Sequence, residues 1–194
     1  MEPQNPFTYF NRAIAYEKLE NYEKAIEDLS FSIKILPNKV EFFLKRAYLL
    51  KKLKAFETSI KDYSNVLKVE PTNSKALFNR GVCYEILSMY LEAEKDFESV
   101  LSQDKTCVAY LFHLASVQER MNSEEKRQEA FKNYNTIIQI DPKNAPAYNG
   151  IGNIYDKLQK YEDSIKFLNI AIELDNTNSL FWNNRACTSR NMGK

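Results

Sequence analysis

The chain has 194 residues, of which 27% are charged, and its formal net charge is +1. Balanced charge gives no electrostatic case for binding nucleic acid or an anionic membrane, since both favour clustered Lys and Arg. No apolar run approaches the roughly 20 residues that span a bilayer. With only 4 Gly and 6 Pro, the composition favours helices, so we expect an all-α protein.

The N-terminal segment predicts two amphipathic helices, at 7–19 and 22–35, because apolar residues recur at steps of three and four. A polar turn at 20–21 separates the helices. Pro37 ends the second helix, since proline lacks a backbone N–H and clashes with the preceding turn. The small Ala25 lets the two helices approach closely. One such pair cannot bury its apolar face alone, whereas stacked pairs can.

The same pattern returns along the chain at a spacing of about 34 residues. In each unit a small residue is followed four positions later by a large one: Ala25 and Leu29, Ser59 and Tyr63, Ala93 and Phe97, Ala130 and Tyr134, Ser164 and Leu168. The expected repeats run 6–39, 40–73, 74–107, 108–144 and 145–178, and a first helix alone occupies 179–194. We number them repeats 1 to 6 and expect them to form a single domain over 1–194.

Two irregularities interrupt the pattern. Repeat 4 has three extra residues within MNSEEKRQEA, which lie either in its turn or in an extended start of its second helix. Repeat 6 is a lone first helix that either caps the array or belongs to a longer one. We favour the longer array, because Phe181 and Trp182 would otherwise leave an apolar face without a partner.

The repeat resembles the tetratricopeptide repeat (TPR), whose pattern is W-x₂-L-G-x₂-Y, then A-x₃-F, then P. Repeat 1 matches it at Tyr9, Arg12, Ala13, Tyr16, Ala25, Leu29 and Pro37, and repeat 5 at Tyr148, Ile151, Gly152, Tyr155, Ser164 and Leu168. The resemblance covers nearly the whole chain. It implies a right-handed α-solenoid of helix-turn-helix repeats, a concave face lined by the first helices, and a non-catalytic role as a protein–protein interaction scaffold.

The internal copies also predict a set of ion pairs. Repeats 1 to 3 carry Arg12, Arg46 and Arg80, and sixteen residues later Asp28, Asp62 and Asp96. Repeats 4 and 5 have Leu114 and Ile151 at the first place, with Asn133 and Phe167 at the second. Because Arg and Asp occur together or not at all, we infer that they pair between the two helices of one repeat, as part of the scaffold.

No motif predicts catalysis, a cofactor or a metal. His113 is the one histidine and has no Cys or carboxylate at ligand spacing. NGIGNIY at 149–155 falls within a predicted helix and lacks the preceding strand of a phosphate-binding loop. No nucleophile, base and oxyanion donors come together, so we do not expect an enzyme. The cysteines are three and far apart, which favours reduced thiols and a cytoplasmic location.

The concave face implied by the resemblance supplies the candidate site. We predict a partner-binding groove formed by Phe10, Ile14, Leu44, Tyr48, Phe78, Val82, Phe112, Asn149 and Asn153. Its first half is apolar and aromatic, and we expect it to hold an amphipathic helix or an apolar extended segment of a partner protein. Its second half is polar and would hydrogen-bond to backbone or polar side chains.

Other roles stay open at this point. The chain could be a structural subunit of a large assembly, such as a ciliary or trafficking complex, or a targeting module of a larger enzyme. It could self-associate through the open repeat 6, or bind partners on its convex face. A chaperone adaptor is disfavoured, because the clamp of Lys and Asn known in such arrays is replaced by Phe10 and Ile14, Leu44 and Tyr48, and Phe78 and Val82.

Overall fold

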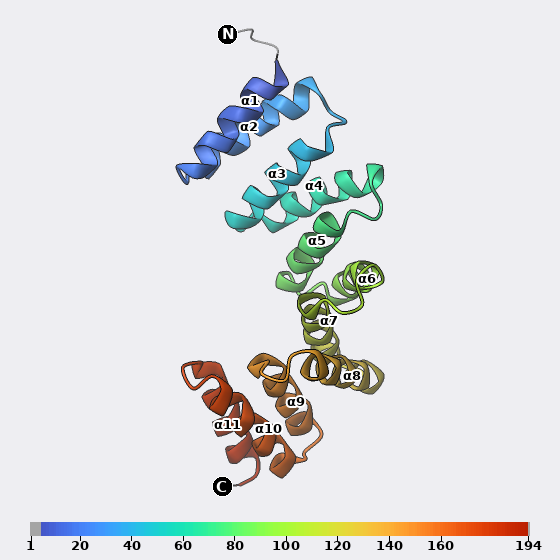
Figure 1. Ribbon diagram of the computed structural model, residues 1–194, viewed down its shortest axis with the longest axis vertical. Coiled ribbons are helices and arrows are strands. Elements are labelled where there is room, and N and C mark those ends of the chain that lie inside the picture. Colours follow the sequence, from blue (N-terminus) through green and yellow to red (C-terminus); the bar gives the residue numbers. More distant parts are fainter. Residues whose placement is uncertain (1–4, 194) are drawn as a thin grey trace. The chain divides into compact units, whose positions relative to one another are not determined.

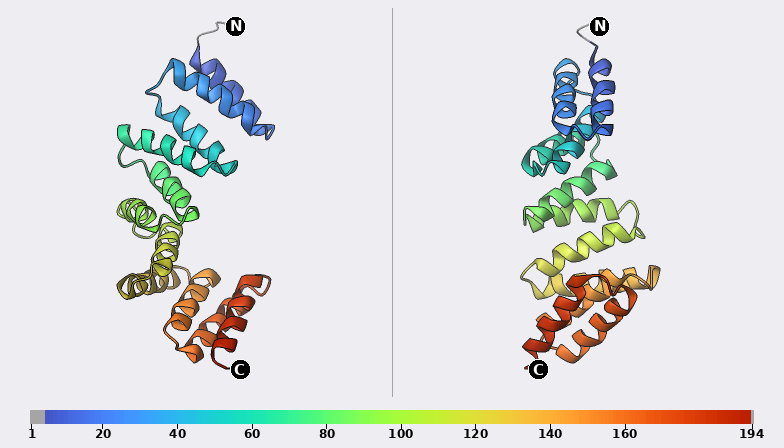
Figure 2. Two further views of the ribbon diagram at one scale, coloured as in Figure 1. Left: turned by 180° about the vertical axis from the view of Figure 1, so that it is seen from behind. Right: turned by 90° about the vertical axis from the view of Figure 1, so that its left-hand side faces the viewer.

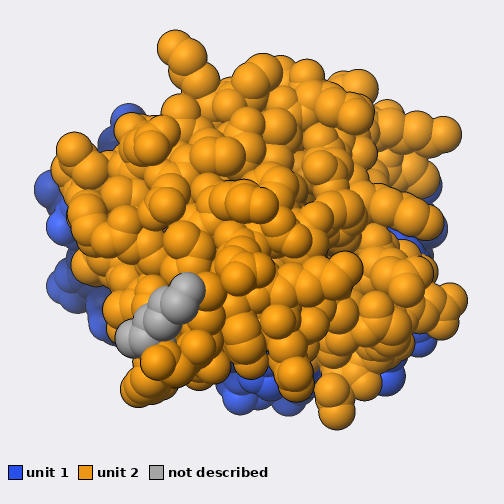
Figure 3. Space-filling view, turned by 90° about the horizontal axis from the view of Figure 1, so that it is seen from below, with its two compact units in different colours: residues 1–100 blue, residues 101–194 orange. Residues whose placement is uncertain are grey.

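The computed structural model describes residues 5–193, and over this range the chain forms eleven α-helices and no strand (Figure 1). The predicted all-α class is therefore confirmed. Residues 1–4 and 194 of the expected domain lie outside the described residues. The chain divides into two compact units, residues 1–100 and 101–194 (Figure 3). We call them unit 1 and unit 2 and describe each by itself, and the single domain over 1–194 stays a prediction.

Both units are built from helical hairpins (Figures 1 and 2). Unit 1 contains α1 (Pro6–Lys18), α2 (Tyr22–Ile35), α3 (Val40–Lys52), α4 (Phe56–Val69), α5 (Ser74–Ile86) and nearly all of α6 (Tyr90–Leu101). Unit 2 contains α7 (Val108–Arg120), α8 (Glu124–Ile140), α9 (Ala145–Lys157), α10 (Tyr161–Leu174) and α11 (Ser179–Asn191). The bounds of the first hairpin differ from the predicted ones by one residue in α1.

Local sequence determines where these helices begin and end. The side chain of Asn21 accepts a hydrogen bond from the backbone N–H of Lys24 and so caps α2. Asn73 caps α5 and Asn144 caps α9 in the same way. The helices α2, α4 and α8 each end two residues before a proline, which cannot continue a helix.

A left-handed residue closes the first helix of four repeats. Glu20, Lys54, Ser88 and Gln159 have φ between 57° and 59° although none is glycine. At the end of α1 this conformation lets the N–H of Glu20 bond to the carbonyl of Glu17, and that of Asn21 to the carbonyl of Tyr16. These two bonds satisfy carbonyls of the last turn and reverse the chain into α2.

The core forms where the repeating small and large residues meet. The small residues Ala25, Ser59, Ala93, Ala130 and Ser164 are all 0% exposed. Their large partners Leu29, Tyr63, Phe97, Tyr134 and Leu168 are buried as well. A larger side chain at the small positions would have no space, because protein interiors are close-packed.

The three extra residues of repeat 4 lie in its second helix. The first helix α7 has 13 residues, as α1, α3, α5 and α9 have, and the turn that follows is three residues long. The second helix α8 has 17 residues, whereas α2, α4 and α10 have 14. Of the two placements that the sequence allowed, the structure has the extended start of the helix.

Candidate functional site

The first helices of repeats 1 to 3 surround a cavity of about 590 Å³ in unit 1. Four of its lining residues belong to the predicted groove: Phe10 and Ile14 of α1, and Leu44 and Tyr48 of α3. The rest of the lining is mostly polar: Glu17, Glu41, Lys45, Tyr63, Lys75 and Asn79. We call this cavity the unit 1 groove.

The apolar part of the unit 1 groove is accessible at one main point. Phe10 is 7% exposed, whereas Tyr48 is 37% exposed. Ile14 and Leu44 are half-buried and pack against core clusters on either side. Tyr48 is therefore the most exposed of the four predicted groove residues that line this cavity.

Phe78 and Val82 do not line this cavity. Both are half-buried residues of α5. The ring of Phe78 lies 5.9 Å from the ring of Phe97 in α6, so it packs within its own repeat. In α5, the residues that reach the unit 1 groove are Lys75 and Asn79. The role of Phe78 and Val82 in binding a partner stays a prediction.

Polar contacts between neighbouring repeats connect the helices that line the unit 1 groove. The Lys45 Nζ atom lies 2.7 Å from Glu17 Oε2, which links α3 to α1. Lys51 Nζ donates to Asn79 Oδ1, which links α3 to α5. The two residues of each pair are 28 positions apart. The sequence analysis did not predict these pairs, because it looked for polar partners only within one repeat. A repeat-to-repeat search for polar partners at that spacing could have found them.

Tyr63 lines the unit 1 groove from α4. Its hydroxyl group is buried and has no hydrogen-bond partner among residues 5–193. Burial raises the pKa of this hydroxyl well above its ordinary value. A buried polar group without a partner is destabilising.

In unit 2, two of the three predicted groove residues contact other side chains of the protein. Asn149 is 7% exposed and its Oδ1 accepts a hydrogen bond of 2.8 Å from Asn184 of α11. The ring of Phe112 lies 6.0 Å from that of Tyr134 and packs against a core cluster. Asn153 is half-buried on α9. Asn149 and Phe112 thus contribute to packing between helices, and their role in binding a partner stays a prediction.

The structure brings each predicted Arg–Asp pair together. Arg46 donates two bonds of 2.7 Å to the two carboxylate oxygens of Asp62. Arg12 binds Asp28, and Arg80 binds Asp96, through the same pair of atoms and at 2.6 to 2.8 Å. The hydrogen bond and charge of Asp96 raise the pKa of Arg80, against the effect of burial.

These arginines also connect neighbouring repeats, which the sequence analysis missed. Arg46 Nη1 donates to Ser30 Oγ of α2 at 2.9 Å, and Arg80 Nη1 donates to Ser64 Oγ of α4 at the same distance. In unit 2, Arg185 Nη1 donates to Asn169 Oδ1 of α10. Each acceptor precedes its arginine by sixteen residues, as the aspartates follow theirs by sixteen.

Repeat 4 replaces the Arg–Asp pair by an uncharged pair. Asn133 donates to Gln118 Oε1 at 2.9 Å, and Gln118 in turn donates to Glu129 at 2.9 Å. Gln118 is buried and lies one helical turn after Leu114. The sequence analysis missed this pair because it compared Asn133 with residue 114, which corresponds to the arginine of repeats 1 to 3.

The described part of the chain offers no cluster of side chains for a metal ion. Over residues 5–193, no group of three His, Cys, Asp or Glu side chains could hold a metal ion. The cysteines Cys83, Cys107 and Cys187 are free. No helix in this range is both long and apolar enough to cross a membrane.

Comparison with known proteins identifies the repeat family. Family models described as tetratricopeptide repeats match residues 6–39, 63–95 and 145–178. A search of curated proteins found no match.

Three solved structures illustrate the likeness of fold. A tetratricopeptide repeat protein from Parabacteroides merdae ATCC 43184 has a TM-score of 0.88 at 16% identity, with 97% of this chain and 74% of that chain covered. YrrB, described as a TPR protein with an unusual peptide-binding site, has a TM-score of 0.83 at 14% identity, with 95% and 94% covered. MamA 41-end from Desulfovibrio magneticus RS-1 has a TM-score of 0.81 at 15% identity, with 89% and 96% covered.

The family-model matches and the similar solved structures both indicate tetratricopeptide repeats. Two of the three matched segments coincide with repeats 1 and 5 as the sequence predicted them. The helical hairpins of both units, with small residues at their close contacts, are the structural form of that repeat. The chain belongs to the tetratricopeptide repeat family, and its fold is a right-handed α-solenoid of helix-turn-helix repeats.

Proposed function

We propose that this protein is a non-catalytic protein–protein interaction scaffold that binds a peptide or helix of a partner in its concave groove. The observation that carries the proposal is the unit 1 groove. It combines an apolar surface from α1 and α3 with polar walls and is about 590 Å³ in volume. Cavities of about 300–1,000 Å³ are usual for ligand sites.

The chemistry of the unit 1 groove favours an apolar side chain as the anchor of the ligand. Phe10 and Ile14 form one apolar wall, and Leu44 and Tyr48 form the other. Buried aromatic contacts dominate the binding energy of most protein interfaces. A main-chain or side-chain polar group next to the anchor would face Lys75 and Asn79. An amphipathic helix or an extended segment with alternating side chains meets both demands.

The comparison with YrrB supports a peptide ligand as an analogy. That protein is described as having a peptide-binding site, and it shares the fold of this chain at 14% identity. The chain's three cysteines are free, which supports a reducing, cytoplasmic location as part of the proposal.

Self-association through α11 is a second candidate with an observation of its own. Leu180 is 53% exposed and Trp182 is 44% exposed, and both lie in the first turn of this helix. The guanidinium carbon of Arg185 lies 4.6 Å from the centre of the Trp182 ring, which partly covers that surface. A mass in solution that rises with concentration would favour this second candidate.

The test compares partner capture by the wild-type chain with capture by Tyr48→Glu. Tyr48 is a better target than Phe78, because Phe78 packs on Phe97 and its replacement would disturb the core. The matched control is Leu91→Glu, which places the same charge on α6 at a position 65% exposed and outside the unit 1 groove.

We expect a partner identified by mass spectrometry to be lost with Tyr48→Glu and kept with Leu91→Glu. Circular dichroism at 222 nm should show the same helicity in all three chains. If Tyr48→Glu retains the same partners at the same yield, the unit 1 groove is not the binding surface and the proposal fails.

A further inference from the structure

The lengthened helix of repeat 4 changes the surface beside it. The small residue is the fourth residue of α2, α4, α6 and α10, but the seventh of α8. Residues 124–126 therefore form an additional turn in front of the part of α8 that corresponds to the other repeats. Ser123 caps this turn by accepting a bond from the N–H of Lys126.

An arginine occupies a position that is aromatic in the other repeats. The first residue of the corresponding helices is Tyr22, Phe56, Tyr90 or Tyr161, and in repeat 4 the residue in register is Arg127. In repeat 1, the Tyr22 ring packs against the core cluster and lies 5.8 Å from Lys52 Nζ of the next repeat. An aromatic side chain thus lies between neighbouring repeats there, and repeat 4 lacks it.

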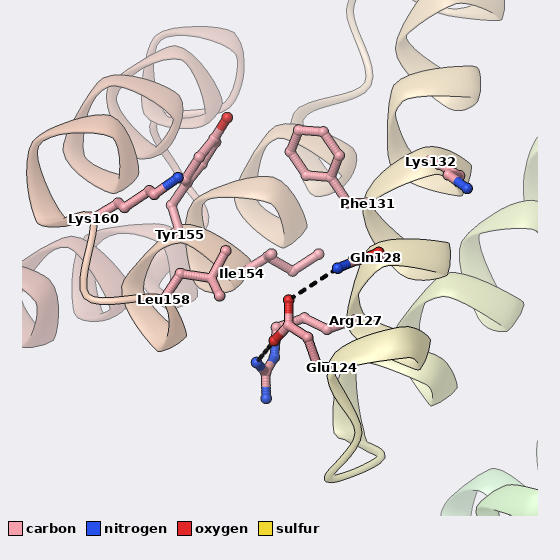
Figure 4. A pocket seen from close by; sticks show the side chains of 9 residues that line it. All are labelled: Glu124, Arg127, Gln128, Phe131, Lys132, Ile154, Tyr155, Leu158 and Lys160. Atoms are coloured by element: carbon pink, nitrogen blue, oxygen red, sulfur yellow. Dashed lines mark hydrogen bonds and ion pairs between the residues drawn. The ribbon is translucent and has the colours of Figure 1, made fainter.

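A pocket of about 350 Å³ is found at this place, between α8 and the C-terminal end of α9 (Figure 4). We call it the α8–α9 pocket. Its apolar wall consists of Phe131 from α8 and of Ile154, Tyr155 and Leu158 at the end of α9. The rings of Phe131 and Tyr155 meet edge to face at 5.7 Å. Leu158 is 36% exposed, so a ligand can reach the wall from solvent.

The polar side of the α8–α9 pocket is rich in hydrogen-bond donors. Arg127 Nη1 lies 2.5 Å from Glu124 Oε2, while Arg127 Nε is buried and has no acceptor within residues 5–193. Lys160 also lines the pocket, and Figure 4 shows it on the side of α9 and α10, away from Arg127 of α8. Lys132 points away from the other lining residues.

We propose that the α8–α9 pocket is a second binding site, which takes an apolar side chain of a partner peptide whose neighbouring residues are acidic. The apolar wall of the pocket contacts the ligand's side chain. This contact corresponds to the packing of Tyr22 between repeats 1 and 2. A carboxylate of the ligand pairs with Lys160. This site is independent of the unit 1 groove, because all of its residues belong to unit 2.

The charges select against a basic ligand. Arg127 and Lys160 lie on two sides of the pocket, and Glu124 is the one acidic residue of its lining. Glu124 is already engaged with Arg127 and with Gln128 Nε2. A Lys or Arg on the ligand would therefore meet the positive charge of Lys160 with no free carboxylate to balance it, whereas an Asp or Glu would pair with it.

The test is a titration of the ¹⁵N-labelled full chain with acetyl-Asp-Asp-Leu-Phe-Asp-amide, followed by amide chemical shifts. The second probe is the basic counterpart, acetyl-Lys-Lys-Leu-Phe-Lys-amide. We expect the acidic peptide to shift signals of residues 124–131 and 154–160 in a saturable manner. The basic peptide should bind at least about tenfold more weakly.

The variant Leu158→Asp removes apolar surface and adds a charge that repels the acidic peptide. Leu53→Asp is the matched control, because both leucines follow the last residue of a first helix and Leu53 is 38% exposed. We expect Leu158→Asp to weaken binding at least about tenfold and Leu53→Asp to leave it unchanged. Should Leu158→Asp lose helicity, the surface change Lys160→Glu replaces it with the same expected loss.

Three results would overturn the proposal. The acidic peptide could cause no saturable shifts, or shifts around Tyr48 only. The two peptides could bind equally, which removes the role of Lys160. Binding could also survive Leu158→Asp, or Lys160→Glu where that variant replaces it.

Discussion

Replacing Asp62 by alanine should destabilise the fold strongly, because it leaves a largely buried arginine without its carboxylate. The side chain of Arg46 is 20% exposed and that of Asp62 is 3% exposed. Two charge-assisted hydrogen bonds of 2.7 Å would be lost, and only the bond to Ser30 would remain. Removing one partner of a buried pair typically costs about 3–5 kcal/mol. We therefore expect a loss of about 3 kcal/mol in the free energy of unfolding.

The assay is urea unfolding at pH 7, followed by circular dichroism at 222 nm, on the wild-type chain and three variants. Asp28→Ala is the matched control, since the side chain of Arg12 is 48% exposed and can be hydrated once its partner is gone. Its loss should be clearly smaller than that of Asp62→Ala. The double variant Arg46→Leu/Asp62→Leu should recover most of the stability, because apolar pairs often replace buried ion pairs at little cost.

This reasoning would be refuted by either of two results. Asp62→Ala could lower the free energy of unfolding by less than about 1 kcal/mol, which is the value of an exposed pair. Asp28→Ala could also prove the more harmful of the two substitutions. Both results would mean that burial of the guanidinium does not determine the strength of these pairs.

Three further predictions concern stability. Gly150→Ala should lower the free energy of unfolding by roughly 1–3 kcal/mol, because its Cβ would meet the ring of Tyr134; a gain in a urea-unfolding experiment would contradict this. Deleting residues 124–126 should cost more than about 1 kcal/mol in the same assay, because it removes Glu124 from Arg127, whose side chain is only 18% exposed; a smaller loss would contradict this. Raising the pH above about 9 should reduce the free energy of unfolding. Burial raises the pKa of Cys83 and Tyr63, so the folded chain keeps protons that the unfolded chain loses. The pH dependence should therefore be weaker in Tyr63→Phe.

The fold could be predicted from the sequence because its determinants are local and repeated. Ala25 and its counterparts mark the close contacts between helices, and all of them are fully buried. The proline positions bound three of the second helices to within two residues. The left-handed residues at Glu20, Lys54 and Ser88 gave no such signal, because none is glycine and the hairpin as a whole imposes the conformation.

The candidate site was less accessible to sequence reasoning. A helical register assigns residues to a face, but it does not say how far each side chain reaches toward the next helix. Phe78 therefore seemed equivalent to Phe10 and Leu44, although it packs on Phe97 instead of lining the unit 1 groove. Contacts between repeats, such as that of Arg46 with Ser30, depend on how successive hairpins stack, which no single repeat encodes.

The most direct test of the central claim is photo-crosslinking from the unit 1 groove. The crosslinking amino acid p-benzoyl-phenylalanine would replace Tyr48 in one chain and Leu91 in another, and both chains would be irradiated in source lysate. The account predicts a partner-specific adduct from position 48 and none from position 91, with the crosslinked residue lying in an apolar segment of the partner. Adducts from position 91 alone would show that the partner binds another face and would contradict the account.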